Sequence, residues 1–278
     1  MKRLAGWMLA SPATLAITFL LVIPVAITVG LSFGSPGQGD WGIVQPYADF
    51  FASGFRRNVL WRTFTVAGWV TVISLAAGLA TAYVVARCPP WMKSTLIVLA
   101  VFPLLTGVVV RSFAWLVLLG REGMVNQVLQ ATGLTDGPVA MLYTQGAVIV
   151  AMVYIFVPLM VLVLVGVLEN IPEDLLQASS SLGAGPVAGF FQITLPLAVP
   201  GLIVGAVLVF TASFTSYATP HLLGGTRQMM MGTFLQQRAL VAFDWPGAAV
   251  VAAIMLAVIV ATVLVMTRVA RRLNPMAT

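Results

Sequence analysis

Six long apolar segments constrain the fold of this chain more than any other feature. They lie at residues 12–34, 63–86, 95–119, 144–168, 197–219 and 246–267. About 20 apolar residues in helical form cross the hydrocarbon core of a bilayer, and each segment meets that requirement. Charged residues make up 8% of the 278 residues, whereas a soluble domain has about 25%. The sequence therefore predicts an all-α membrane protein, with a single transmembrane domain of six helices over residues 1–278.

The first apolar segment follows Met1-Lys2-Arg3 and begins like a signal peptide. It is longer than the apolar region of a signal peptide, however, and no clean small-x-small cleavage site follows it. The next charged residue is Asp40. We therefore interpret this segment as a retained membrane anchor.

The distribution of Lys and Arg indicates an orientation in the membrane. An even number of spans places both tails on one side, and both tails are basic. The short 87–94 loop on that side is basic as well, which gives seven basic residues there against six on the other side: Lys2, Arg3, Arg87, Lys93, Arg268, Arg271 and Arg272. Cytoplasmic loops carry the excess of Lys and Arg, so we expect both termini and the 169–196 loop in the cytoplasm. These residues are dispersed rather than clustered on one face, so the net charge of +6 does not indicate nucleic-acid binding.

The loop over residues 170–196 is unlike the apolar segments. Pro172 suits the first position of a helix, and the two carboxylates after it suit the positive helix end. Gly183 is expected to end this short helix and turn the chain. A second short helix is expected at 187–192. It leads to residues 193–196, where the next span is expected to begin. The pattern predicts a cytoplasmic helix-turn-helix that lies across the membrane face.

The same loop contains a motif with fixed spacing. Gln177-Ala178-Ser179 is followed by three residues, Gly183, nine residues and Ile193-x-Leu195-Pro196. This resembles the EAA loop of ABC-importer permeases, which reads Glu-Ala-Ala, x3, Gly, x9, Ile-x-Leu-Pro; Gln177 and Ser179 depart from it. In that family the loop forms a coupling helix that sits in a groove of the ATPase subunit. The resemblance implies an ATPase-coupling role for these residues: Glu173, Gln177, Ala178, Ser179, Gly183, Ile193, Leu195 and Pro196.

The resemblance extends over nearly the whole chain. Residues 103–115 (PLLTGVVVRSFAW), Asn126, 219–225 and 244–249 are similar to spermidine/putrescine-type permeases, a group with opine and aminophosphonate relatives. It implies the type I ABC-importer permease fold in a bacterial inner membrane. The implied partners are an ABC ATPase dimer, a second, non-identical permease and a substrate-binding protein. We expect a polyamine as substrate; an aminophosphonate, an opine or another small anionic or zwitterionic solute is the alternative.

No enzymatic activity is expected of this chain. It lacks the Gly-x4-Gly-Lys-Ser/Thr nucleotide-binding pattern, so ATP and Mg²⁺ would bind to the partner ATPase. The single Cys88 and single His221 indicate no metal site. A secondary transporter usually shows inverted repeats or an acidic relay at the midplane, and neither is visible. A membrane enzyme would need a catalytic constellation that the spans lack.

Candidates for substrate contact lie in the spans. Arg111 is the ionisable residue within them, and such residues are costly and usually functional; it either lines the path or pairs with a helix end or with carbonyls of the partner permease. Aromatic rings could bind an amine by cation–π contacts. The hydroxyls near Ser213 fit either a polar path or interhelical hydrogen bonding. The substrate-path candidates are Arg111, Trp115, Tyr154, Ser213, Phe214 and Tyr217.

Three residues carry predictions about helix geometry. Pro103 and Pro158 lie inside apolar segments, where proline kinks or locally opens a helix. Asp244 precedes Trp245-Pro246, an arrangement typical of a helix N-terminus.

Overall fold

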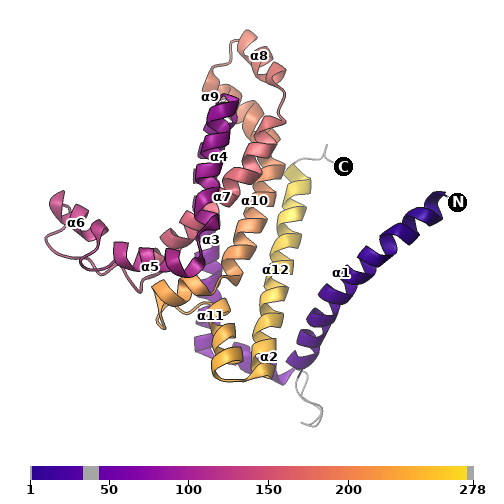
Figure 1. Cartoon of the computed structure of the whole chain (residues 1–278), viewed down its shortest axis with the longest axis vertical. Helices are drawn as coiled ribbons and strands as arrows, with labels where there is room; N and C mark the ends of the chain where they lie inside the picture. Colours follow the sequence, from indigo (N-terminus) through magenta and orange to yellow (C-terminus); the bar gives the residue numbers. More distant parts are fainter. Residues whose placement is uncertain (1, 34–43, 274–278) are drawn as a thin grey trace. The chain divides into compact units, whose positions relative to one another are not determined.

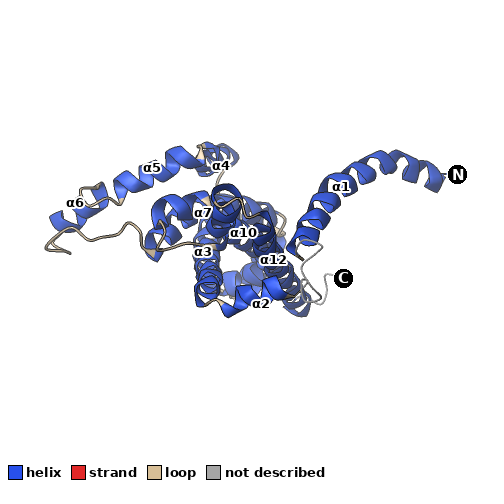
Figure 2. Ribbon diagram, turned by 90° about the horizontal axis from the view of Figure 1, so that it is seen from below, coloured by secondary structure: helices blue, strands red, loops and turns tan. Residues whose placement is uncertain are grey.

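The computed structural model describes the backbone of residues 2–33 and 44–273; the side chains of 2–11, 13, 173 and 270–273 lie outside the described part. α-Helices joined by short turns and π-helical segments form these ranges (Figure 2). The predicted all-α fold is confirmed.

Within residues 2–33 and 44–273, five helices are long and apolar enough to cross a membrane (Figure 1). They are α1 (Lys2–Ser32), α3 (Gly54–Ala86), α7 (Gln145–Glu169), α10 (Leu195–Thr215) and α12 (Trp245–Leu273). Two further helices, α4 (Pro90–Leu105) and α5 (Val108–Leu118), form a bent pair. If this pair is one broken span, the number of spans rises to six. The count matches the sequence-based expectation. α7 continues through Pro158 as one helix.

The third predicted span differs from expectation. The segment 95–119 was expected as one helix, but α4 and α5 meet at 93°. Thr106 and Gly107 have extended ψ values of 135° and 140°, which end α4 and start α5. Pro103 lies in the last turn of α4 and supplies no backbone N–H, so the helix is weakened just before the break. The Thr106 hydroxyl donates to the Pro103 carbonyl at 2.7 Å and satisfies a group that the break leaves free.

The chain divides into two compact units, residues 1–58 with 234–258 and residues 59–233 with 259–278. In the second unit, α7 packs on α4 and α10. Met160 of α7 is fully buried in the core. A Cβ placed on Gly205 of α10 would collide with the Met160 sulfur, and one on Gly78 of α3 would lie 2.7 Å from the Met160 Cβ. Small residues let membrane helices approach closely, so these glycines allow the tight packing around α7.

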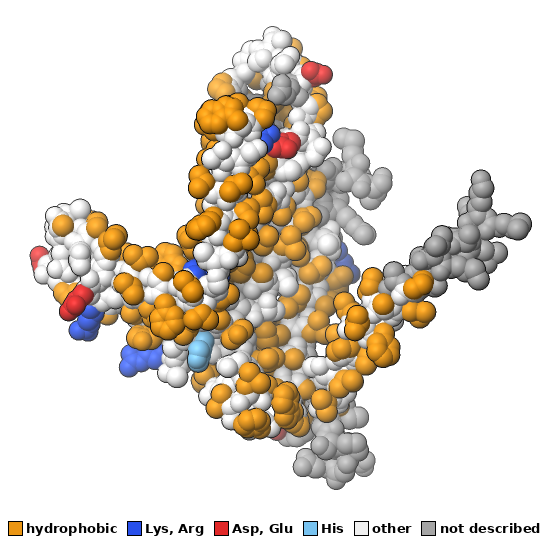
Figure 3. All heavy atoms as spheres, in the orientation of Figure 1, with side chains coloured by type: hydrophobic (Ala, Val, Ile, Leu, Met, Phe, Trp, Pro, Cys, Tyr) orange, Lys and Arg blue, Asp and Glu red, His pale blue; other side chains and the backbone are white. Residues whose placement is uncertain are grey.

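Short elements connect the spans of the second unit. They are α6 (Met124–Ala131), α8 (Glu173–Ser181), α9 (Pro186–Gly189), η1 (Phe190–Thr194) and η2 (Pro220–Gly224). Figure 1 shows α8 beyond the ends of α7 and α10. In Figure 3, apolar side chains cover α4 and α5, while charged side chains appear near α6 and α8.

The first unit contains α2 (Gln45–Ala52), η3 (Gln237–Val241) and the first part of α12; α11 (Met231–Gln236) crosses the boundary of the two units. Asp244 caps α12 by accepting from the Gly247 N–H at 2.9 Å, which confirms the predicted helix start. Burial alone would raise the pKa of the Asp244 carboxyl, but the Gly247 hydrogen bond and the charges of Arg238 and Arg56 lower this pKa overall. Arg238 is its ion-pair partner.

Candidate functional site

The predicted coupling loop folds as a short helix with a sharp C-terminal turn. α8 begins at Glu173, one residue later than expected, with Pro172 preceding it. Gly183 has a φ of +87°, a conformation that glycine adopts at little cost. The Ala184 N–H donates to the Ser179 carbonyl at 3.0 Å across this turn. The prediction that Gly183 ends the helix is confirmed.

The motif residues of α8 are divided between an outer and an inner face of the helix. Gln177 and Ala178 are exposed, and Ser179 is half-buried. A Cβ on Gly189 of α9 would lie 3.5 Å from the Ser179 hydroxyl oxygen, so the two short helices meet there. Glu173 falls in the first turn, but its side chain lies outside the described part. The outer face of α8 is therefore free to contact another molecule, while its inner face packs on α9.

The second half of the loop differs from the prediction. A separate helix was expected at 187–192 before the next span. Instead α9, η1 and α10 form one continuous helix, Pro186–Thr215. Pro196 has no N–H, so the regular hydrogen bond from its nitrogen is missing. The adjacent turn widens accordingly, and the Leu195 N–H donates to the Phe190 carbonyl in the π-helical pattern. No break therefore separates α9 from span α10.

The last three motif residues lie in this widened turn. Ile193 and Leu195 are half-buried, and Pro196 is exposed. Leu195 also packs against the core cluster. The apolar end of the motif therefore fixes η1 to the helix bundle.

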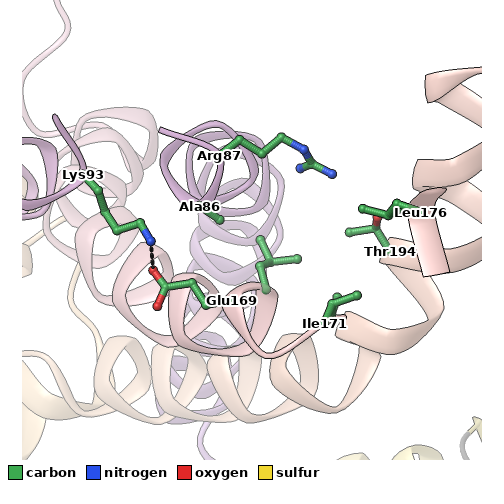
Figure 4. Close-up of a pocket in the computed structure, with 8 residues that line it drawn as sticks. Ala86, Arg87, Lys93, Glu169, Ile171, Leu176 and Thr194 are labelled. Carbon is green, nitrogen blue, oxygen red and sulfur yellow. Dashed lines mark ion pairs between the residues drawn. The ribbon is translucent and has the colours of Figure 1, made fainter. Parts of the chain in front are cut away.

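A polar pocket of about 270 Å³ lies behind α8 (Figure 4). Arg87 in the turn after α3, Lys93 of α4 and Glu169 of α7 line it, together with Leu176 of α8 and Thr194 of η1. The Lys93 Nζ lies 2.7 Å from a Glu169 carboxylate oxygen. This ion pair links α4 to the end of α7, immediately before the loop. The Thr194 hydroxyl oxygen is buried without a hydrogen-bond partner.

Sequence reasoning did not identify Glu169 as part of this site. The sequence does contain a sign of it: Glu169 is a carboxylate at the end of an apolar segment, on the side of the membrane where the basic 87–94 loop was expected. The pairing itself depends on the packing of α4 against α7. It could not be read from local sequence.

Arg111 is held by the broken span. Its side chain is 9% exposed, and one guanidinium nitrogen donates to the Pro103 carbonyl at 2.7 Å. The Arg111 Nε is buried without a partner. Of the two roles expected for Arg111, the observed contact corresponds to pairing. The acceptor is a carbonyl in the last turn of α4 of this chain, not a carbonyl of another subunit.

The remaining path candidates form two groups. Trp115 of α5 meets Tyr154 of α7 edge to face, with ring centroids 5.7 Å apart. Ser213 and Phe214 are buried on α10, and Phe214 stacks on Phe210. Tyr217 lies beyond the end of α10 and is 53% exposed. The structure thus brings together Trp115 and Tyr154, with Arg111 one turn away on α5.

Two hydroxyls near the end of α10 make no hydrogen bond to another helix within the described residues. Thr215 donates to the Thr211 carbonyl of its own helix at 2.9 Å, and the Ser213 hydroxyl is buried without a partner. Interhelical hydrogen bonding was one of the two interpretations of this cluster, and these two hydroxyls do not supply it.

Comparison with known proteins identifies the family. Residues 4–275 match the family described as binding-protein-dependent transport system inner membrane component. The spermidine/putrescine transport system permease protein PotB of Haemophilus influenzae is 30% identical over 232 residues, which cover 82% of this chain and 81% of that protein. PotB of Escherichia coli strain K12 is 30% identical over 217 residues, which cover 78% of this chain and 79% of that protein.

Solved structures support the same fold. A chain of the bacterial ABC transporter that imports the acidic polysaccharide alginate matches with a TM-score of 0.79 and 17% identity, covering 99% of this chain and 97% of that one. A chain of the methionine transporter MetNI in an inward-facing conformation matches with a TM-score of 0.59 and 15% identity, covering 82% and 98%. The expected fold and the family resemblance are confirmed. This chain belongs to the binding-protein-dependent transport system inner membrane component family and is a multi-pass permease subunit of an ABC importer, not an enzyme.

Proposed function

We propose that this permease carries a polyamine such as spermidine or putrescine, delivered by a binding protein. The observation that carries this proposal is the 30% identity to PotB over four-fifths of both chains. One feature of the site is compatible with an organic cation: Trp115 and Tyr154 present aromatic surface of the kind that binds amines. The Arg111 guanidinium keeps its positive charge while it donates to the Pro103 carbonyl, so in this proposal the carboxylates that bind the amines come from the second permease.

Uptake by the assembled importer tests the substrate class. The importer, with its binding protein, would be reconstituted in liposomes and supplied with ATP and either radiolabelled spermidine or an aminophosphonate. ATP-dependent spermidine uptake is expected. If only the aminophosphonate were taken up, the proposed polyamine would be wrong, the substrate would be an anion, and Arg111 would become a candidate for binding it.

We infer that α8 is the contact with the ATPase. Its support is the motif spacing, the exposed Gln177 and Ala178, and the direct continuation of α9 into α10. ATP and Mg²⁺ belong to the ATPase in this proposal. The second permease is a different chain, a point that rests on the resemblance to the polyamine group. Co-purification from native membranes followed by mass spectrometry tests for the ATPase and for the second permease. Recovery of this permease as a homodimer would refute the proposal that the second permease is a different chain.

We propose that both termini and α8 face the cytoplasm. The supporting observation is that Arg87 and Lys93, from the basic loop, line the same pocket as Leu176 of α8, and cytoplasmic loops are rich in basic residues. Cys88 lies in that loop and is the sole cysteine of the sequence. A membrane-impermeant maleimide is expected to label Cys88 in inside-out vesicles and to leave it unlabelled in intact spheroplasts. Labelling in the spheroplasts would reverse the orientation.

A further inference from the structure

An apolar groove of about 530 Å³ lies between α3 and the α9–η1 segment. Leu79, Ala80 and Tyr83 form its α3 wall, and Val187 and Phe191 lie on the other. Val187 is 68% exposed and Phe191 59% exposed. The groove is therefore an open apolar channel on the surface of a membrane-spanning helix, wide enough to take a hydrocarbon chain.

A cation lies where this groove meets the polar pocket. The Arg87 guanidinium carbon is 3.5 Å from the centroid of the Tyr83 ring, which is part of the groove wall. Arg87 also lines the polar pocket, and Figure 4 shows its side chain extending toward the side of Leu176 and Thr194. The Arg87 guanidinium therefore lies at the edge of both cavities.

The charge of Arg87 is available to an anion. Lys93 is neutralised by Glu169 at 2.7 Å. Among the described side chains, no carboxylate lies within ion-pair distance of Arg87, which donates only to its neighbouring Tyr83 carbonyl at 3.3 Å. Guanidinium groups bind phosphate oxygens by charge-assisted hydrogen bonds, and basic residues at the end of a span recruit anionic lipids.

We propose that the groove holds an acyl chain of an anionic phospholipid whose phosphate binds Arg87. The groove offers apolar walls for the acyl chain, and at its edge Arg87, which has no carboxylate partner among the described side chains, offers a cation for the headgroup. The far wall of the groove is α9 and η1, which follow α8 in the chain. The bound lipid braces this segment against α3 and so links the composition of the membrane to the position of α8.

Native mass spectrometry of the assembled importer tests the site. The complex would be released from nanodiscs that contain equal amounts of phosphatidylglycerol and phosphatidylethanolamine. Retention of phosphatidylglycerol is expected, and Arg87→Gln is expected to lower its preference over phosphatidylethanolamine about fivefold, the effect of one surface cation on anionic-lipid binding. Arg268→Gln removes an equal charge from the exposed end of α12 and is expected to leave the preference unchanged. Equal loss in both variants, or no loss in Arg87→Gln, would overturn the proposal.

The acyl-chain part is tested inside the groove. Ala80→Phe fills the α3 wall and is expected to reduce retained phosphatidylglycerol, whereas Val84→Phe changes an exposed residue of the same helix that does not line the groove. A photoreactive amino acid at Val187 provides a readout that does not depend on these substitutions. Adducts with phospholipid are expected. Adducts with another subunit instead would show that a protein occupies the groove and would overturn the proposal.

Discussion

The α7–α10 pair and the α4–α5 pair are both built from apolar helices, but different contacts hold them. α7 and α10 pack closely because glycines admit Met160 and Val167; a Cβ on Gly201 would lie 2.6 Å from a Val167 methyl carbon. α4 and α5 instead meet at 93°, and the Pro103 carbonyl accepts one hydrogen bond from Thr106 at the end of α4 and one from Arg111 of α5, across the break. The first pair is a packed scaffold, whereas the second owes its geometry to a few polar contacts.

The comparison indicates which parts of the permease are attached to one another. The α9–η1–α10 helix is continuous, and α10 is packed tightly on α7. α8 follows directly from the end of α7. The coupling loop is therefore attached at both ends to the scaffold. α4 joins this end of the scaffold through the exposed Lys93–Glu169 ion pair as well as its packing on α7.

The largest effect is expected from Gly205→Val. The added side chain would collide with the Met160 sulfur, and overpacking of a core costs about 1–3 kcal/mol. Thermal unfolding of the detergent-solubilised permease should shift to lower temperature. Gly166→Val is the matched control, because Gly166 is exposed on α7 and has open space around its Cβ position. Equal shifts in the two variants would show that close packing at Gly205 is not what holds α10 on α7.

A comparable or smaller effect is expected from Arg111→Met. Loss of the charged donor to the Pro103 carbonyl should cost about 1.5–3 kcal/mol of folding free energy, and Arg111→Lys should recover part of it. Thermal unfolding and substrate uptake would be measured together. A variant with unchanged stability and lost uptake would contradict the bend-holding role and assign Arg111 to the substrate path.

The smallest effect is expected from breaking the Lys93–Glu169 pair. The side chains are 26% and 39% exposed, and exposed ion pairs contribute about 0–1 kcal/mol. A double-mutant cycle with Lys93→Gln and Glu169→Gln measures their coupling, which should weaken in high salt. A coupling energy of several kcal/mol, insensitive to salt, would mean that α4 is fixed to α7 as firmly as α10 is.

Local sequence patterns predicted the coupling loop well, because its structure depends on local chemistry. Pro172 starts α8 within one residue of expectation, and Gly183 adopts the left-handed conformation that ends it. The continuous helix through Pro196 was missed, since a proline there suggested a new start rather than a widened turn. The family assignment was accurate because the spacing from Gln177 to Pro196 is specific.

The bend in the third span could not be predicted in the same way. Residues 95–119 are apolar apart from Arg111 and a few small polar residues, and the hydropathy of a segment does not show where its helix axis changes direction. Pro103 indicated a disturbance, but the 93° angle depends on the ψ values of Thr106 and Gly107 and on Arg111 reaching back to Pro103. The roles of the substrate-path candidates stay predictions, since burial of Ser213 and Phe214 and pairing of Trp115 with Tyr154 describe packing rather than binding.

The central claim is that α8 couples this permease to its ATPase, and Gly183→Asp tests it most directly. Gly133 is the matched control: its φ of +70° imposes similar backbone strain, and neither glycine has an atom within 4 Å of its Cβ position. Both variants would be reconstituted with the full importer, and ATP hydrolysis and substrate uptake measured side by side at equal permease content. We expect Gly183→Asp to lose most of its uptake and its substrate-stimulated ATP hydrolysis, while Gly133→Asp retains both. Normal uptake by Gly183→Asp would contradict the coupling role of α8.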